Sequence, residues 1–160
     1  MIGHHSQAIT MAQWAPTHSA SASLQIMAAR IINAQQDEIA TMQRWLREHN
    51  QPVPDGTTQG MKMTMNGVEH VMLMPGMLTA EQMQQLDVAR GPTFDRRFLT
   101  FMIQHHNGAL SMVEKLFGSY GAAQDEVVFK FANDVSADQG SEIDRMHRML
   151  DGLPAAPASP

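Results

Sequence analysis

The chain has 160 residues, the size of one domain, and is long enough to bury a substantial core. Its formal net charge of -5 argues against a nucleic-acid partner, and no stretch approaches the roughly 20 apolar residues that span a membrane. Cysteine is absent, which excludes disulfides, thiolate metal sites and thiol catalysis. The 15 methionines and 8 histidines are an excess, and their placement decides whether they fill a core or bind a soft metal.

Helical periodicity predicts two helices in the first third of the chain. Apolar residues spaced by three and four positions predict a helix over 4–15, which Pro16 ends. Ser19 or Ser21 would cap a longer amphipathic helix over 24–48.

The middle of the chain, 51–92, is predicted to be a methionine-rich linker with one short helix. Within it, 68–74 has the composition of a short extended stretch. Thr79 followed three residues later by Gln82 fits a capping box, which predicts a short helix to about Arg90.

Two further helices are predicted in the last part of the chain. Pro92 breaks the preceding helix, and Thr93 would cap a long helix that ends at about Phe117. The last helix is predicted over 123–150. The tail 151–160 is rich in alanine and proline and is expected to fray.

An internal repeat organises these elements. The sequence His-His-x-x-Ala near the start, in 4–11, recurs with the same apolar pattern in 105–112. A second motif, Gln-x-x-Glu-Ile-x-x-Met, begins at Gln35 and again at Gln139. The predicted fold is therefore an all-α, four-helix bundle with pseudo-twofold symmetry. Its single domain, 1–150, would consist of a first helix pair (1–50), the linker and short helix (51–92) and a second helix pair (93–150).

The repeat also bears on the first residue. Met1 aligns with Met102, which lies inside the predicted long helix, and the counterpart of 93–101 is missing. We therefore expect Met1 to be an internal methionine of a natural chain that begins earlier.

The repeated motifs place polar side chains on apolar helix faces. Because helix residues advance by 100°, His105, His106 and Met112 fall within one arc of about 120°. If the repeated faces pack together, imidazoles, carboxylates and thioethers should meet in or beside one core. The residues that contribute them are His4, His5, Met11, Glu38, Met102, His105, His106, Met112 and Glu142. Such a set could bind a metal, or it could form a buried His–Glu–Gln network that fixes the helix register.

The linker methionines are a second candidate site. They occur at Met61, Met63, Met65, Met72, Met74 and Met77, with His70 among them. Side chains two residues apart project from the same side of an extended segment, and thioethers suit Cu(I). The alternative is a loop whose methionines fill gaps over the bundle.

Other histidines and methionines are expected to be structural. Met27, Met42 and Met83 have core spacing, and His18, His49 and His147 are assigned to the surface or to helix ends. A ferritin-type di-iron site requires Glu-x-x-His pairs on two helices, and only Asp144-x-x-His147 comes close.

These motifs together resemble a bacterial family of ferritin-like bundles that is known as a domain of unknown function. The resemblance rests on 4–11 with 35–46, on the linker run 74–79, and on Phe94-Asp95-Arg96-Arg97-Phe98-Leu99 followed by His105-His106. It implies an exported protein and copper binding without an established enzyme activity. The implied ligands are His4, His5, Met11, Met102, His105, His106, Met112 and the linker methionines.

The resulting hypothesis is a periplasmic or otherwise extracytoplasmic protein that sequesters or transfers Cu(I), Cu(II) or Ag(I). Glu38 and Glu142, with Gln35 and Gln139, would orient the imidazoles through hydrogen bonds. A copper-transfer partner protein and a homodimer are compatible with this hypothesis. Two rival hypotheses are a helical interaction module that binds no metal and a redox enzyme with a carboxylate–histidine metal centre.

Overall fold

The computed structural model of the chain describes residues 1–56, 61–65 and 68–154, with side chains for all of these except 61–65 and 68–71. It confirms the predicted helical bundle and adds a small hairpin. The helices are α1 (Ile2–Gln13), α2 (Ala15–His18), α3 (Ala22–Glu48), α4 (Ala80–Val88), α5 (Gly91–Gly118) and α6 (Glu126–Asp151). The strands are β1 (Met61–Met65) and β2 (Val68–Met72).

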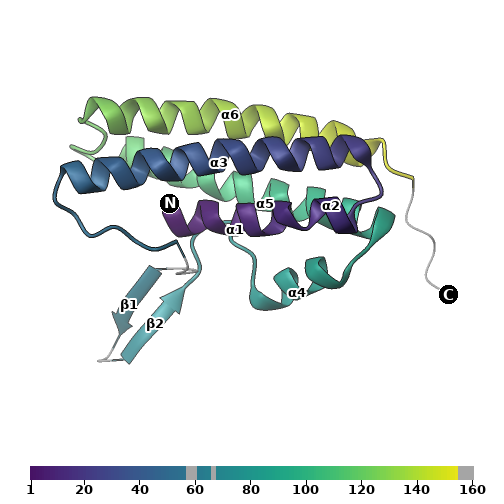
Figure 1. Cartoon of the computed structure of the whole chain (residues 1–160). Helices are drawn as coiled ribbons and strands as arrows, with labels where there is room; N and C mark the ends of the chain where they lie inside the picture. Colours follow the sequence, from purple (N-terminus) through teal and green to yellow (C-terminus); the bar gives the residue numbers. More distant parts are fainter. Residues whose placement is uncertain (57–60, 66–67, 155–160) are drawn as a thin grey trace.

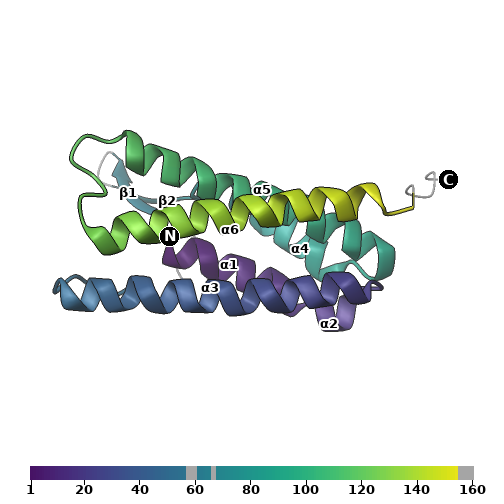
Figure 2. The same ribbon diagram turned by 90° about the horizontal axis from the view of Figure 1, so that it is seen from above.

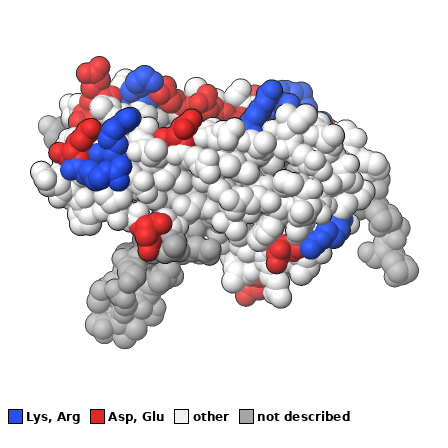
Figure 3. Space-filling model, viewed as in Figure 1, with Lys and Arg blue, Asp and Glu red and all other residues white. Residues whose placement is uncertain are grey.

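The four long helices form two packed pairs. Helix α1 packs mainly against α3, and α5 packs mainly against α6, as the repeat predicts. Figures 1 and 2 show the pairs side by side, with α4 beside the bundle and the hairpin projecting away from it. Charged side chains gather over α3 and α6, whereas the face over α1 carries few (Figure 3). None of the helices in the described part of the chain has the length and apolarity needed to cross a membrane.

The structure confirms the predicted cap of α4 and selects Ser21 from the two predicted candidates for α3, which begins at Ala22 rather than at 24. The Ser21 side chain accepts a hydrogen bond from the backbone N–H of Leu24 at the start of α3. At α4, the Thr79 hydroxyl accepts from the Gln82 N–H, and the Gln82 side chain accepts from the Thr79 N–H, which completes the capping box.

Three predicted ends were wrong. Pro16 does not stop the helical chain but lies in the first turn of α2, where a missing N–H is tolerated. For the same reason α5 begins at Gly91, with Pro92 in its first turn, rather than at a Thr93 cap. Helix α6 begins after Asp125, whose side chain accepts a hydrogen bond from the backbone N–H of Val128, rather than at Ala123, which has a left-handed φ of 53°.

The extended stretch in the linker is confirmed as part of a hairpin. Strand β2 ends at Met72, so the predicted range 68–74 was two residues too long. It pairs in antiparallel register with β1, placing Met61 opposite Met72 and Met63 opposite His70. The side chains of Met61, Met63, Met65 and His70 lie outside the described residues, so the prediction that these methionines bind copper stays open.

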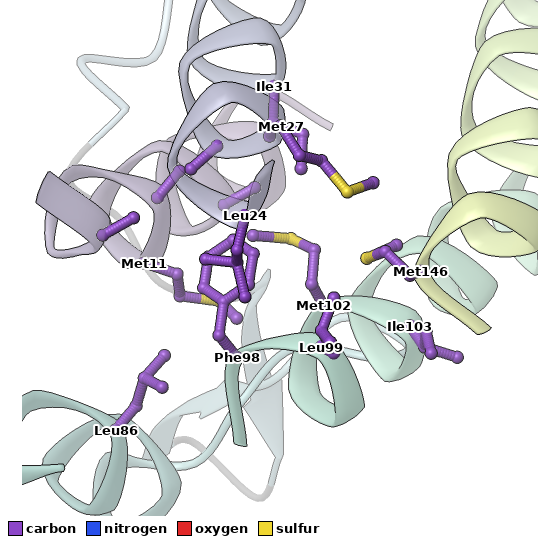
Figure 4. Close-up of a cluster of buried hydrophobic side chains, with 14 of the residues drawn as sticks. Met11, Leu24, Met27, Ile31, Leu86, Phe98, Leu99, Met102, Ile103 and Met146 are labelled. Carbon is purple, nitrogen blue, oxygen red and sulfur yellow. The ribbon is translucent and has the colours of Figure 1, made fainter. Parts of the chain in front are cut away.

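The main core lies where α1, α3, α5 and α6 meet. Its largest side chains include Phe94, Phe98, Leu24 and Leu99, all fully buried. Four methionines join them: Met11, Met27, Met102 and Met146. Those of α3, α5 and α6 point into the space that these helices enclose (Figure 4).

Candidate metal centre: a buried histidine cluster

The two His-His pairs meet in the interior of the bundle. His4 and His5 come from α1, His105 and His106 come from α5, and all four side chains are fully buried. The rings of His4 and His105 lie against each other, with centroids 3.8 Å apart and planes inclined by 35°. Within each pair the centroids are 6.2 Å apart. The pseudo-twofold arrangement of α1 and α5 therefore brings four imidazoles into one cluster.

His5 and His106 are the outer imidazoles of the cluster. Each of them contacts a carboxylate from the repeated Gln-x-x-Glu motif. Nε2 of His106 hydrogen-bonds Oε2 of Glu142 on α6 at 2.7 Å. Nε2 of His5 lies 2.8 Å from Oε2 of Glu38 on α3, although the direction of this contact is unfavourable for a hydrogen bond. A carboxylate on Nε2 favours the tautomer that leaves the Nδ1 lone pair free. Among the residues that the structure describes, Nδ1 of both rings has no hydrogen-bond partner.

The inner imidazoles, those of His4 and His105, also have few partners. His4 donates from Nε2 to the backbone carbonyl of Pro75 in the linker, at 3.0 Å, and its Nδ1 has no partner in the described part of the chain. Neither ring nitrogen of His105 makes a hydrogen bond of good geometry within the described residues, although the ring lies near the backbone of His4. A buried polar atom without a partner costs about 1–3 kcal/mol. The cluster therefore destabilises the fold unless these nitrogens bind a ligand.

Burial lowers the pKa of three of the four imidazoles. Desolvation, followed by repulsion from His5, lowers the pKa of His4 to about 3. Desolvation, followed by the Met1 ammonium, also lowers the pKa of His5 to about 3. Burial lowers the pKa of His105 well below its ordinary value, with a smaller contribution from His4. The imidazoles of His4, His5 and His105 are therefore neutral at pH 7, which is the form that binds a metal.

The carboxylates come close enough to influence each other. Burial, followed by repulsion from the Glu142 charge, raises the pKa of Glu38 to about 7. A cation in the cluster would relieve this repulsion. The predicted orienting glutamines, Gln35 and Gln139, are buried. Within the described residues, however, Gln35 Oε1 and both amide atoms of Gln139 have no hydrogen-bond partner.

The linker reaches the cluster through a close backbone contact. A Cβ on Gly108 of α5 would lie 2.0 Å from the Pro75 carbonyl oxygen, so only glycine permits this approach. Gly76, at φ 76°, turns the linker there. The Gln7 side chain holds the next stretch through two hydrogen bonds to the Leu78 backbone, of 2.8 and 3.1 Å. These contacts place the Pro75 carbonyl on His4, a partner that the sequence did not reveal.

The predicted methionine ligands divide among three environments. Met11 and Met102 belong to the apolar core (Figure 4). Met74 and Met112 line an open apolar pocket of about 500 Å³ at one end of α1. Met77 is buried in the linker, whereas Met72 is half exposed.

The histidines outside the cluster are structural in this arrangement. His18 is buried rather than at the surface, and Nε2 donates to the Asp87 carbonyl at 2.9 Å. His49, at the end of α3, stacks on Trp45 with ring centroids 4.1 Å apart. His147 is exposed on α6.

No three His, Asp or Glu side chains among the described residues converge on a point that could hold a metal. The orientation of the rings and the carboxylate contacts explain this. The His4 and His105 rings lie against each other instead of aiming their nitrogens at a common point, and the carboxylates engage the outer rings. A metal here requires rotation of the inner rings or a thioether in the ligand set.

The fold and site define a class: a helical bundle in which two repeated hairpins enclose a buried histidine cluster flanked by carboxylates. The chain belongs to the DUF305 family, a domain of unknown function, whose profile matches residues 1–150. No curated protein matches the sequence.

Solved structures share the fold over nearly the whole chain. A DUF305 protein from Streptomyces coelicolor, provisionally described as secreted, is 23% identical with a TM-score of 0.77, over 94% of this chain and 86% of that one. A DUF305 fragment from Deinococcus radiodurans is 23% identical with a TM-score of 0.77, over 96% and 91%. CopM in its Cu(II)-bound form is 26% identical with a TM-score of 0.73, over 96% and 93%. CopM has also been solved with Cu(I) and with Ag.

Proposed function

We propose that this protein binds copper, as Cu(I) or Cu(II), and also Ag(I), and that the histidine cluster is the centre of the site. The observation that carries the proposal is that four fully buried imidazoles have ring nitrogens without a hydrogen-bond partner among the described residues. Burying such atoms is costly unless a ligand satisfies them. The similarity to CopM, which has been solved with copper and silver, supports the choice of metal.

The donor chemistry agrees with copper. Imidazole binds both copper oxidation states, and the thioether is a soft ligand for Cu(I) and Ag(I). His4, His5, His105 and His106 would supply nitrogen, and Met74 or Met112, which line the apolar pocket, would supply sulfur. Glu38 and Glu142 would hold the outer rings in the tautomer that frees Nδ1. We assign no catalytic step to the site.

A location outside the cytoplasm fits this donor set. Thioethers form no disulfides, so a methionine site without cysteine tolerates an oxidising compartment better than a thiolate site, although methionine still oxidises to its sulfoxide. We therefore propose sequestration or transfer of the metal in the periplasm or outside the cell.

The alternative of a metal-free structural network is weaker. Such a network requires that each buried member is satisfied, because a half-satisfied network is worse than an apolar core. Within the described residues, His105 makes no hydrogen bond of good geometry at either nitrogen, and Gln139 none at either amide atom.

An anaerobic Cu(I) titration against a competing chelator tests the proposal. The test variant is His4→Gln with His105→Gln, which removes the inner ring pair. The matched control is His147→Gln, an exposed histidine on α6. Circular dichroism and thermal melts establish that the variants fold.

We expect tight binding by the unaltered protein and by the control, and binding weakened at least about tenfold in the double variant. Equal binding by all three proteins would show that copper binds elsewhere than at the histidine cluster. Failure of the unaltered protein to compete would overturn copper binding altogether.

A further inference from the structure

An acidic hollow of about 620 Å³ lies between α3 and α6, the two helices over which charged side chains gather (Figure 3). Its walls come from the second half of α3 and the first half of α6, and these helices belong to different packed pairs. Five carboxylates and two cationic side chains line it: Asp37, Glu38, Glu126, Asp134 and Asp138 against Arg44 and Lys130.

The internal repeat shows that the bundle does not require these acidic residues. Aligning the repeated Gln-x-x-Glu motifs also brings the first residues of α3 and α6, Ala22 and Glu126, into register. In this alignment the positions equivalent to Glu126, Asp134, Asp138 and Asp37 hold Ala22, Arg30, Ala34 and Ser141. The same fold thus accepts neutral or basic residues at each of these positions. The acidic cluster occurs on one side of the pseudo-twofold axis only, the side of Glu38 and His5.

The inner end of the hollow reaches the histidine cluster through Glu38. The Glu38 side chain lines the hollow and is 15% exposed, and its Oε2 lies 2.8 Å from Nε2 of His5. His5 is fully buried, and neither of its ring nitrogens makes a hydrogen bond within the described residues. A buried imidazole without a hydrogen-bond partner is therefore directed at the wall of the hollow, behind a single carboxylate.

The charges of the hollow act at this inner end. Burial and the Glu142 charge, followed by the charges of Asp138 and Asp134, raise the pKa of the Glu38 carboxyl. A negative potential that disfavours an ionised carboxylate favours a cation at the same place. Clefts lined by one sign of charge also raise the local concentration of counter-ions, and with it association rates, by roughly 10- to 1000-fold.

We propose that the acidic hollow is the entrance through which the metal cation reaches the histidine cluster, and that Asp37 and Asp138 attract the cation towards Glu38 and His5. This inference rests on the proposed function, because it requires a metal at the cluster. No three His, Asp or Glu side chains in the described part of the chain converge on a point that could hold a metal, so the hollow attracts the ion without retaining it. The imidazoles provide the stable site.

Stopped-flow mixing of the full chain with Cu(II), in sodium perchlorate, measures the association rate constant through the quenching of tryptophan fluorescence. The test variant is Asp37→Asn with Asp138→Asn, which removes one charge of the hollow from each helix. The matched control is Glu48→Gln with Asp144→Asn, which removes one exposed acidic residue from each of the same helices outside the hollow. Both variants have the same net charge, so a general effect of net charge is the same in both.

At an ionic strength of about 0.1 M the Debye length is about 10 Å, so that distant charges are largely screened. We expect the test variant to bind Cu(II) about threefold or more slowly than the control and the unaltered protein. At about 1 M, where the Debye length is about 3 Å, the three rate constants should agree.

Equal rate constants for the test variant and the control at 0.1 M would overturn the entrance, and histidine-dependent binding at equilibrium would leave the proposed function intact. A slower rate that is also found when His4→Gln and His105→Gln are added would show that the hollow binds the metal by itself, which would likewise overturn the entrance. Absence of Cu(II) binding by the unaltered protein would refute Cu(II) binding at the cluster and the entrance together.

Discussion

The contact between the linker and α5 at Gly108 gives a sharp prediction, because one methyl group separates the observed packing from a clash. In Gly108→Ala, the new Cβ would lie 2.0 Å from the Pro75 oxygen and 2.4 Å from its carbonyl carbon. The linker must then move by about 1 Å or more to reach a tolerable contact. Both neighbours are backbone atoms, so no side-chain rotation relieves the overlap.

The cost follows from the bonds that this movement breaks. His4 would lose its 3.0 Å hydrogen bond to the Pro75 carbonyl, and the two bonds between Gln7 and the Leu78 backbone would be strained. Each buried polar group left without a partner costs about 1–3 kcal/mol. Alanine recovers about 1 kcal/mol of helix propensity relative to glycine. The net expectation is a destabilisation of about 2–4 kcal/mol.

Urea unfolding followed by circular dichroism measures this difference. Gly140→Ala is the matched control, because a Cβ there has no described atom within 4 Å beyond its own helix. The control should gain about 0.5–1 kcal/mol from propensity alone. If Gly108→Ala were as stable as Gly140→Ala, the close docking of the linker on α5, and with it the Pro75 contact to His4, would be refuted.

Three further predictions concern the cluster and its supports. The pKa of His4 is about 3 in the fold against 6.5 unperturbed, so its neutral form contributes stability above pH 6.5 that is lost as the pH falls towards 3. In His4→Gln the free energy of unfolding should therefore depend less steeply on pH, by about 1.4 kcal/mol per pH unit between pH 6 and 4, as measured by urea unfolding. Glu142→Gln replaces the carboxylate on His106, and we expect about tenfold weaker Cu(I) binding in the chelator competition, with no change refuting the orienting role. Thr79→Ala removes the cap of α4 and should cost about 1 kcal/mol by thermal unfolding; no loss would contradict the capping box.

The sequence predicted the bundle because its helices have unbroken apolar periodicity and two of them have explicit caps. Ser21 and Thr79 could be recognised from the residue type and its spacing. Two of the errors arose because proline is compatible with two positions relative to a helix. Pro16 and Pro92 can end a helix or occupy its first turn, and the choice depends on backbone angles that composition does not show.

The arrangement of the candidate site could be predicted only in part. The helical wheel placed both His-His pairs on apolar faces, and the repeat paired each with a glutamate. The stacking of His4 on His105 depends on how α1 crosses α5, which a single-helix pattern does not contain. The Pro75 carbonyl at His4 depends on a contact between two glycines that are far apart in the chain.

Methionine was the hardest residue type to assign. Met11 and Met102 were predicted to be ligands and lie in the apolar core. Met42 was predicted to be a packing residue and lines the open apolar pocket. Met42 has the same motif position as the buried Met146. The environment of each residue depends on which helices pack over α3 and α6, so helical spacing alone could not separate the two.

X-ray absorption at the copper edge of the Cu(I)-loaded protein tests the central claim most directly, since nitrogen and sulfur ligands give distinct distances of about 2.0 and 2.3 Å. We predict nitrogen scatterers from imidazole that diminish in the His4→Gln, His105→Gln variant and persist in His147→Gln. A first shell of sulfur alone, unchanged between the two variants, would contradict a copper site centred on the histidine cluster.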